Sequence, residues 1–411
     1  MANLIRFGHQ SCQWSSSYSI KIWNFARTLS TSIAANNATV TMQQPSDGDE
    51  HQASVERESN ATSLSIHVPS KVNNPVLHDI EHIGQFYTVR QDDMDAVLAK
   101  ALPRRLTSFS KVIGSADIMI RDPAIDIINQ LKKRSPDEQP LKFIIGGRDG
   151  TGKTVTLAHV IHYCYRSNWF ILHVPSVYKW ISPNCEVKRS HRRKKFWDQI
   201  DHACEWLKLC KSINKHLIGN MFIKKTFHYG RGDKFVKGDS LAKVIEQGLL
   251  KSEFSVDVVE CILQELATQN EIPVLYAVDE YNAFFGKSAV QDWDKKNIDP
   301  VYLSLIANFT RVLEPKSRLR NGAYVMAISR TGAPRTHCYT AKQLLPGVGM
   351  RRSEPYSPKV VSNLTKEEVK TFIHYYKMKS WLNYENDTEI NEIHDLTSGN
   401  PLLLSKISAW N

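Results

Sequence analysis

Short apolar runs alternate with amphipathic stretches through the middle of this chain. Four runs are dominated by apolar residues and have the length of buried strands: 141–145, 170–174, 272–278 and 323–328. Between them, apolar residues recur every three or four positions, from Leu157 to Cys164 and from Ser255 to Ala267, which is the spacing of amphipathic helices. Strands that alternate with helices predict an α/β fold, in which helices flank a parallel sheet.

The first apolar run leads directly into a glycine-rich loop. Residues 147–154 read GRDGTGKT and fit the pattern G-x-x-x-x-G-K-[ST] at every fixed position. A predicted strand precedes the loop and a predicted helix follows it, which is the setting of the phosphate-binding loop (P-loop) of NTPases. The predicted phosphate-binding residues form one continuous segment: Gly147, Arg148, Asp149, Gly150, Thr151, Gly152, Lys153, Thr154 and Val155.

Each fixed residue of this loop has a physical task. Glycines permit positive φ angles, so the backbone curls and turns several N–H groups toward one anion. The dipole of the following helix also favours negative charge there. Lys153 would reach the β- and γ-phosphates, and the hydroxyl of Thr154 is the expected Mg²⁺ ligand. The loop therefore predicts a nucleotide polyphosphate with Mg²⁺.

Polar residues follow the third and fourth apolar runs. Asp279 is predicted to hold Mg²⁺, directly or through water. Glu280 is placed for a base that activates water, and a surface acid without catalytic duty fits the sequence equally well. Ser329 is a candidate sensor of the γ-phosphate, with a strand cap as the alternative. No sequence argument directs Arg330 toward a phosphate.

The C-terminal segment carries the signals of a small helical domain. Thr365 and Glu368 form a capping box before a stretch with helical periodicity. Residues 398–401, SGNP, end one helix and start the next. We predict a P-loop α/β domain over residues 78–356 and a helical lid over residues 357–411.

The N-terminal segment has the composition of a targeting signal. The first 46 residues contain no Asp or Glu, but several Ser, Thr and basic residues. This pattern is typical of a mitochondrial transit peptide, which we assign to residues 1–36, with a disordered cytosolic tail as the alternative. Residues 37–77 are predicted to be a disordered linker because their polar and acidic part lacks periodicity.

Composition excludes several other classes of protein. The 411 residues are 42% apolar and 23% charged, as in ordinary globular proteins. No apolar run approaches the ~18 residues of a membrane-spanning helix, so no membrane span is predicted. The seven cysteines form no CxxC pair, which argues against a zinc module or a disulfide scaffold.

The net charge of +11 is concentrated in one segment. Residues 179–238 contain 15 Lys and Arg against 5 Asp and Glu, with aromatic residues interleaved. Clustered cations release counterions when they contact phosphates, so the segment predicts a nucleic-acid contact. A solvated basic insertion in the α/β domain is the alternative interpretation.

Several separate blocks of the sequence resemble one known family. The segment 146–181, GGRDGTGKTVTLAHVIHYCYRSNWFILHVPSVYKWI, is similar to the P-loop region of the death-associated, GTP-binding proteins of the mitochondrial ribosome's small subunit. Further similar blocks occur in the right order: HIGQFYTV (82–89), RDPAIDII (121–128), KGDSLAKVIEQGL (237–249), VLYAVDEYNAF (274–284) and VSNLTKEEVKTFIHYYKMKSWL (361–382). The resemblance covers most of the chain from about residue 78 onward.

The resemblance implies a P-loop domain of the AAA+ and STAND type with a C-terminal lid, which binds a guanine nucleotide, GTP or GDP, and Mg²⁺. It also implies a monomer in the head of the small ribosomal subunit, in the mitochondrial matrix. The implied partners are small-subunit rRNA, other mitoribosomal proteins and the large subunit. Members of this family support mitochondrial translation and are linked to apoptosis.

Three points stay open at the level of sequence. No N-K-x-D motif selects guanine, so ATP is an alternative nucleotide. The sequence implies neither the presence nor the absence of nucleotide hydrolysis, including slow GTPase activity. A nucleotide that stays bound as part of the structure is the leading interpretation. A free-standing mitochondrial AAA+ or STAND-type NTPase that acts as a switch or motor is the second function. An adaptor whose nucleotide gates partner binding is the third.

Overall fold

The computed structural model describes residues 69–408, apart from 137, 230–231, 333–339 and 383–386. The chain divides into two units, Met1–Leu64 and Ser65–Asn411, and all described residues belong to the second. The predicted transit peptide and most of the predicted linker lie outside the described residues. The linker prediction is wrong at its end, because the Ser70 backbone N–H donates to Phe86 O at 2.7 Å and residues 75–77 form the 3-10 helix η1.

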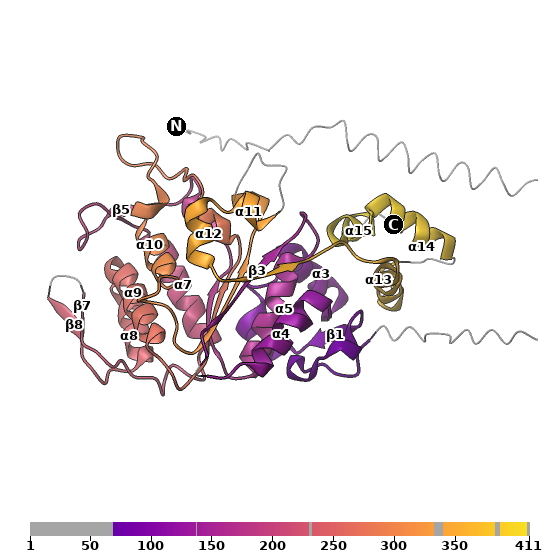
Figure 1. Ribbon diagram of the computed structural model, residues 1–411, viewed down its shortest axis with the longest axis horizontal. Helices are drawn as coiled ribbons and strands as arrows, with labels where there is room; N and C mark the ends of the chain where they lie inside the picture. The colour runs from indigo at the N-terminus through magenta and orange to yellow at the C-terminus, as the bar shows by residue number, and fades with distance from the viewer. Residues whose placement is uncertain (1–68, 137, 230–231, 333–339, 383–386, 409–411) are drawn as a thin grey trace, which may run out of the picture. The chain divides into compact units, whose positions relative to one another are not determined.

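A parallel sheet forms the centre of this unit (Figure 1). Within the described residues it has five strands, in the order β11-β3-β10-β9-β4. Their bounds are β3 Leu141–Gly146, β4 Phe170–Val174, β9 Val274–Val278, β10 Gly322–Ala327 and β11 Ser357–Val360. The four predicted strands and the α/β fold class are confirmed. The pattern missed β11 because this edge strand is short, contains Pro358 and alternates between half-buried and exposed positions.

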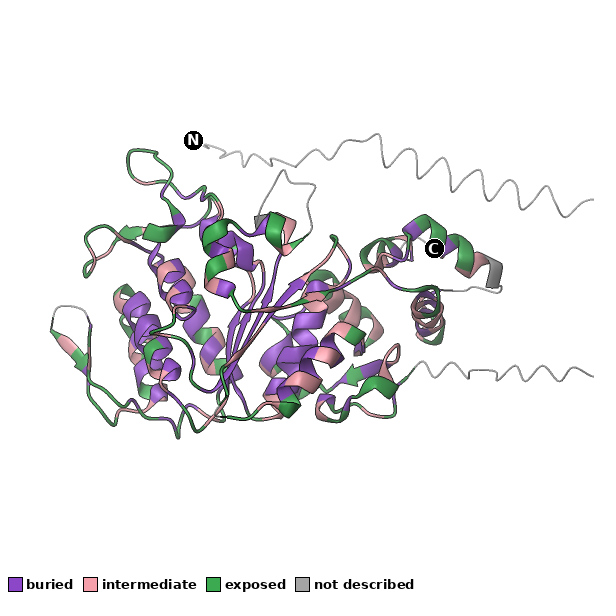
Figure 2. Ribbon diagram, viewed as in Figure 1, coloured by how far each residue is buried: buried purple, intermediate pink, exposed green. Residues whose placement is uncertain are grey.

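Helices cover both faces of the sheet, and their buried sides face it (Figure 2). On one face lie α4 (Asp122–Lys133) and α5 (Lys153–Arg166), packed against Phe143, Ile145 and their neighbours. The other face is covered by α7 (Ile200–Ile213), α8 (Leu241–Leu250), α9 (Ser255–Ala267) and α10 (Ser304–Arg311). Alternate residues of β3, β4, β9 and β10 therefore belong to two different apolar cores.

The basic segment 179–238 contributes to one of these cores. Its central helix α7 buries Trp206 and Leu207, and Trp206 Nε1 donates to His173 O of β4 at 3.0 Å. Two small hairpins flank this helix: β5 (Lys188–Arg189) with β6 (Trp197–Asp198), and β7 (Phe227–Tyr229) with β8 (Asp233–Phe235). A merely solvated insertion is therefore the wrong description, because α7 is part of the helical layer on the sheet.

The C-terminal helices pack as a separate small cluster. The predicted capping box is confirmed, since Thr365 Oγ1 accepts from the Glu368 N–H at 3.2 Å at the start of α13 (Lys366–Met378). The segment 357–411 starts with β11 in the sheet, so the helical part begins only with α13. This cluster contacts the antiparallel pair of β1 (Phe86–Val89) and β2 (Ala116–Met119), where the rings of Phe86 and Tyr375 stack at 4.1 Å.

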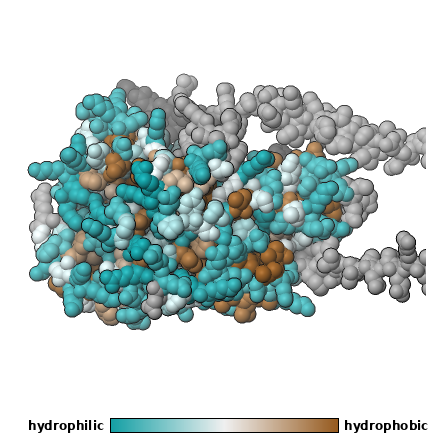
Figure 3. Space-filling view, in the orientation of Figure 1, coloured by the Kyte–Doolittle hydropathy of each residue, from teal (hydrophilic) through white to brown (hydrophobic). Residues whose placement is uncertain are grey.

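The remaining elements are mostly short. In chain order they are η2 Ile80–His82, β1 Phe86–Val89, α2 Gln91–Asp93, η3 Met94–Leu98, α3 Arg104–Ile113, β2 Ala116–Met119, α6 Tyr178–Ile181, η4 Ser252–Phe254, η5 Tyr281–Phe285, η6 Pro300–Tyr302, η7 Arg330–Gly332, α11 Ala341–Leu344, α12 Gly347–Ser353, α13 Lys366–Met378, α14 Asp387–Thr397 and α15 Pro401–Ile407. Among the described residues, no helix is long and apolar enough to cross a membrane. Hydrophilic side chains cover most of the face seen in Figure 3.

Buried histidines join α5 to the N-terminal segment. His78 Nδ1 and His159 Nε2 are 2.9 Å apart, and both rings are almost wholly buried. His162 contacts Tyr87 OH at 3.1 Å and Asp93 Oδ2 at 3.2 Å. The structure thus places His159 and His162 in a buried polar network.

This network is expected to make stability depend on pH. Burial lowers the pKa of His78 from 6.5 to about 4, so the unfolded chain binds a proton that the folded chain resists. Stability should therefore be full above about pH 6.5 and fall as the pH drops toward 4. Urea unfolding at a series of pH values measures this slope. His78→Gln should flatten the slope, exposed His228→Gln should not, and a flat wild-type profile would contradict the prediction.

Candidate nucleotide-binding site

The predicted P-loop joins β3 to α5 at the carboxyl end of the sheet. Gly147, Gly150 and Gly152 have φ angles of 148°, 81° and 102°, so the loop has the curled backbone that its glycines predict. A Cβ atom on Gly147 would lie 2.3 Å from Val361 O, beside the edge strand. Larger residues at these positions would therefore disturb the curl.

The curl leaves backbone donors for an anion. Among the described residues, none accepts a hydrogen bond from the backbone N–H groups of residues 148–152. Helix α5 begins immediately afterwards at Lys153, so its first N–H groups also face this region. Successive N–H groups in a curled loop form a concave anion site. The local backbone thus fits a phosphate chain.

The side chain of Lys153 lies against the loop. Its ammonium group donates to Gly147 O at 3.0 Å and to Arg148 O at 2.8 Å. Burial lowers the pKa of this lysine, while the nearby carboxylates of Asp149 and Asp279 raise it. A buried cation with nearby carbonyl acceptors is stabilised further by an anionic ligand. Lys153 is therefore placed for its predicted role.

The two predicted Mg²⁺ ligands contact each other. Thr154 Oγ1 donates to Asp279 Oδ2 at 2.6 Å, which joins the P-loop helix to the end of β9. Burial raises the pKa of Asp279 to about 6, an effect that the hydrogen bond from Thr154 opposes. The described residues contain no group of three or more His, Cys, Asp or Glu side chains placed around one point. A Mg²⁺ ion here would need phosphate oxygens and water to complete its shell, as is usual for this ion.

Glu280 is directed toward the loop after β4. Its Oε2 atom accepts from the backbone N–H of Tyr178 at 3.1 Å and from Ser176 Oγ. The residue itself has a φ of 58°, in the left-handed region that is uncommon for a glutamate. Its backbone N–H donates to Asp279 Oδ1 at 2.8 Å. Glu280 is therefore close to the two predicted Mg²⁺ ligands, Thr154 and Asp279. Its carboxylate already accepts hydrogen bonds from protein donors.

Ser329 is fixed at the end of β10 by a residue that the sequence did not single out. Asn282 Oδ1 accepts from Ser329 N–H at 2.9 Å, and Asn282 Nδ2 donates to Ser329 O at 2.8 Å. Ser329 Oγ also contacts Thr331 Oγ1 at 3.1 Å. The sequence shows only an asparagine three residues after Asp279, with nothing that points to Ser329 as its partner. This arrangement fits the strand-cap role, although Ser329 also lines the cavity described below.

Two arginines also reach the P-loop. Arg330 Nε lies 3.2 Å from Asp149 Oδ2 in the loop, a contact that sequence gave no reason to expect. Arg121 donates to Thr151 O at 3.1 Å and forms a two-pronged ion pair with Glu368 of α13. Arg121 comes shortly after β2 and Arg330 shortly after β10, and the fold brings the ends of both strands to the P-loop. Their placement depends on the fold and has no local sequence signature.

The C-terminal helices contact the same loop. Asn400 Nδ2 donates to Asp149 O at 2.8 Å, and the Leu402 N–H donates to Gly150 O at 3.2 Å. A Cβ atom on Gly150 would lie 2.6 Å from Asn400 Oδ1, so the approach is close enough to require glycine. The predicted cap residue Asn400 thus joins the helical cluster to the P-loop.

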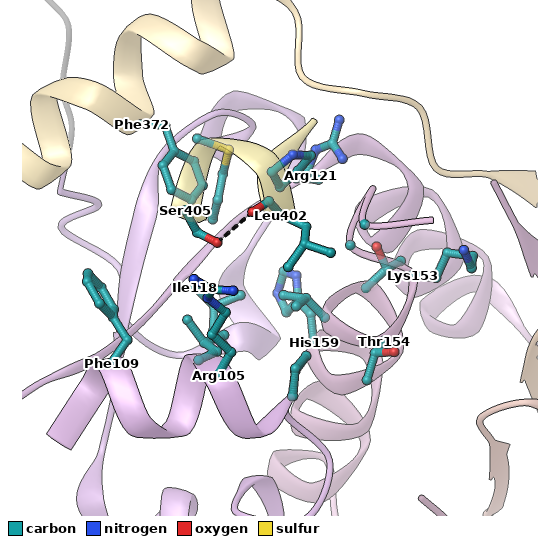
Figure 4. Close-up of a pocket in the computed structure, with 18 of the residues that line it drawn as sticks. Arg105, Phe109, Ile118, Arg121, Lys153, Thr154, His159, Phe372, Leu402 and Ser405 are labelled. Atoms are coloured by element: carbon teal, nitrogen blue, oxygen red, sulfur yellow. Dashed lines mark hydrogen bonds between the residues drawn. The ribbon is translucent and has the colours of Figure 1, made fainter. Parts of the chain in front are cut away.

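A cavity of about 660 Å³ opens beside the P-loop (Figure 4). Its walls come from α3, β2, the P-loop and the C-terminal helices, and residues labelled in the view include Arg105, Phe109, Ile118, Arg121, Lys153, Thr154, His159, Phe372, Leu402 and Ser405. Most of this lining is apolar. His159 has a buried Nδ1 atom without a hydrogen-bond partner among the described residues. A cavity that is polar at the phosphate loop and apolar beyond it suits a nucleotide.

A parallel sheet with a curled loop after β3, and an acid pair after β9 at the same end of the sheet, makes this an α/β protein whose fold is compatible with that of P-loop NTPases. A sequence model of the family described as mitochondrial ribosomal death-associated protein 3 matches residues 118–407, and the chain belongs to this family. The family resemblance noted in the sequence is therefore confirmed.

Individual relatives carry a ribosomal name. The chain is 31% identical over 347 residues to the small ribosomal subunit protein mS29 of Bos taurus, which covers 82% of this chain and 87% of the bovine protein. It is 31% identical over 346 residues to mS29 of Mus musculus, with 82% and 88% covered. The mS29 protein of Neurospora crassa is 19% identical over 260 residues, with 62% and 55% covered.

Proposed function

We propose that this protein is a structural component of the small subunit of the mitochondrial ribosome and supports translation in the mitochondrial matrix. The observation that carries the proposal is 31% identity over 82% of the chain to proteins named as components of that subunit. The acid-free composition of the first 46 residues supports import into mitochondria. The link to apoptosis rests on the resemblance alone.

We further propose that the P-loop holds a nucleotide with Mg²⁺. The curled loop, its unpaired N–H groups and Lys153 would bind the phosphates. Thr154 and Asp279 would bind Mg²⁺, which neutralises phosphate charge, and the cavity beside the loop would take the nucleoside. The guanine base, as GTP or GDP, rests on the family resemblance, and ATP is the alternative.

The engaged side chain of Glu280 favours a retained nucleotide over rapid turnover. A general base must reach the water whose proton it takes, whereas this carboxylate accepts from Ser176 and Tyr178. The nucleotide would then stabilise the junction between the P-loop and the C-terminal helices. Small-subunit rRNA, other mitoribosomal proteins and the large subunit are the proposed partners of this monomer.

One experiment tests both parts of the proposal. The tagged full-length chain is expressed in mitochondria, and lysates are separated on salt-washed gradients. The chain should sediment with the small subunit, and denaturing that fraction should release about one guanine nucleotide per chain. Sedimentation as a free protein or a ring with nucleotide turnover would instead support a free-standing NTPase.

Glu280→Gln should leave bound nucleotide unchanged and alter turnover little. The substitution keeps a hydrogen-bond acceptor for Ser176 and Tyr178 while removing the negative charge. Loss of a true catalytic base slows a reaction by about 10²–10⁴-fold, which phosphate-release assays detect easily. Asp279→Asn is the matched control and should lower Mg²⁺-dependent occupancy. A large loss of turnover in Glu280→Gln would identify an active hydrolase.

A further inference from the structure

We propose that the end of the parallel sheet where the strands begin, opposite the P-loop, binds the phosphate backbone of RNA. The proposal rests on the ribosomal function above, because it names a surface for the rRNA contact. The surface, defined here as the basic edge, consists of cationic side chains from four separate segments: Arg134, Lys142, Lys316, Arg318, Arg320, Arg351 and Arg352.

Parallel pairing brings these segments together. Leu141 at the start of β3 lies opposite Ala323 at the start of β10, so the segments before both strands lie at the same end of the sheet. The P-loop follows β3 and is therefore at the other end. Side-chain contacts join the segments: Arg134 donates to Asn321 Oδ1, and Arg318 Nη1 donates to Gln139 Oε1 at 3.4 Å.

The segment before β10 points its cations outward. Lys316, Arg318 and Arg320 are exposed, whereas Leu319 and Asn321 between and beside them are buried. The Leu319 N–H donates to Tyr324 OH at 2.8 Å, and Asn321 Nδ2 donates to Asn270 O at 2.7 Å. Anchored buried residues thus hold alternate cations toward solvent.

Carboxylates offset only part of this charge. Glu314 pairs with Arg352 at 3.1 Å, and the other described acids of these segments, Glu138 and Glu354, are exposed. Lys142 donates to the backbone oxygens of Arg352 and Glu354, each at 3.3 Å. Burial lowers the pKa of Lys142 and the charge of Arg318 lowers it further, so an anion would relieve repulsion here.

A cavity of about 490 Å³ lies within the basic edge. Four cations, Lys142, Arg318, Arg351 and Arg352, line it, together with two carboxylates, Glu314 and Glu354, and the half-buried ring of Tyr356. Guanidinium groups match the oxygens of a phosphate with paired hydrogen bonds. Exposed cations around a cavity lined by guanidinium groups fit an RNA backbone that runs across the edge and places a phosphate in the cavity.

The basic segment 179–238 is the weaker candidate, although it has the higher charge in sequence. Two of its arginines are used within the fold: Arg192 lies 3.4 Å from Glu260 Oε2, and Arg193 Nη2 donates to Asn308 Oδ1 at 2.9 Å. These contacts attach the β5–β6 hairpin to α9 and α10. Three exposed lysines remain on that hairpin, Lys188, Lys194 and Lys195, and they provide a matched control.

The test compares two triple variants of the full chain. Binding to a transcript of mitochondrial small-subunit rRNA is measured by fluorescence anisotropy across a range of KCl concentrations. Lys316→Ala/Arg318→Ala/Arg320→Ala should weaken binding about 100-fold near 0.1 M salt and lower the slope of log K against log salt by about 2–3. Lys188→Ala/Lys194→Ala/Lys195→Ala should change affinity by less than about 5-fold. Circular dichroism checks that both variants fold.

Other outcomes overturn the assignment. No loss in the basic-edge variant, or an equal loss in both variants, would show that RNA binds elsewhere or without a defined surface. If the basic-edge variant leaves the small subunit on gradients but keeps wild-type affinity for the transcript, the edge binds an acidic protein instead. Failure of the wild-type chain to sediment with the subunit would refute the proposed function, while the affinity comparison still decides the basic edge.

Discussion

Lys153→Ala is expected to release the bound nucleotide and to lower the thermal stability of the protein. The variant removes the buried ammonium group that lies against the loop, and charge-assisted hydrogen bonds of this kind contribute about 1.5–3 kcal/mol each. A ligand present at 100 times its Kd stabilises the native state by about 2.7 kcal/mol. Because the entropy of unfolding grows with chain length, loss of this stabilisation should lower the melting temperature by about 4 °C, measured by calorimetry with nucleotide present.

The control for this variant is an exposed lysine. Lys194→Ala changes the net charge equally, but Lys194 lies on the solvent side of the β5–β6 hairpin and should leave occupancy and melting temperature unchanged. Nucleotide content is read from the denatured protein by chromatography. Full occupancy in Lys153→Ala would show that the phosphate site has been placed wrongly.

Arg121→Ala should detach the C-terminal helices from the α/β domain. Arg121 and Glu368 form a nearly buried pair, 12% and 15% exposed, and Arg121 also donates to the backbone oxygens of Thr151, Ser362 and Asn363. Loss of one partner leaves an unpaired charge and several free acceptors, at a cost of about 2–4 kcal/mol. Urea unfolding and limited proteolysis of α13–α15 measure the effect. Nucleotide occupancy should fall too, because Thr151 belongs to the P-loop.

Two matched variants separate charge from helix capping. In the wild-type chain the Thr365 N–H donates to Glu368 Oε2 at 2.9 Å. Glu368→Gln keeps an oxygen that can accept this hydrogen bond and removes only the ion pair with Arg121. It should cost less than Arg121→Ala. Arg90→Ala breaks an exposed pair with Asp92, 66% and 85% exposed, and should change stability by less than about 1 kcal/mol. Unchanged unfolding and protease resistance in Arg121→Ala would refute the proposed junction.

Elements with a strong local pattern were predictable. The strands β3, β4, β9 and β10 are continuous apolar runs, and the P-loop has residue types that only a curled backbone requires. The caps at Thr365 and Asn400 depend on hydrogen bonds to residues two or three positions away. Such local interactions leave signals in the sequence because the partners are neighbours in the chain.

Elements that depend on distant partners were not predictable. Strand β11 exists because β3 offers an edge, and its own residues show no strand pattern. Asn282 was missed because its partner, Ser329, is 47 residues away. Helix α7 was assigned to a basic insertion because the many charged residues of segment 179–238 outweighed the apolar residues of the helix that pack on β4.

The sequence by itself determined the fold class, the phosphate loop and the family, because each follows from short-range periodicity, spacing or matching blocks of residues. Only the tertiary structure decided where the charges act. In the folded chain Glu280 accepts a hydrogen bond from Ser176, and Arg192 forms an ion pair with Glu260. The basic edge consists of segments that are nearly 220 residues apart in the sequence. The physical reason is that electrostatic effects depend on distance and burial in space, which parallel strand pairing sets and chain position does not.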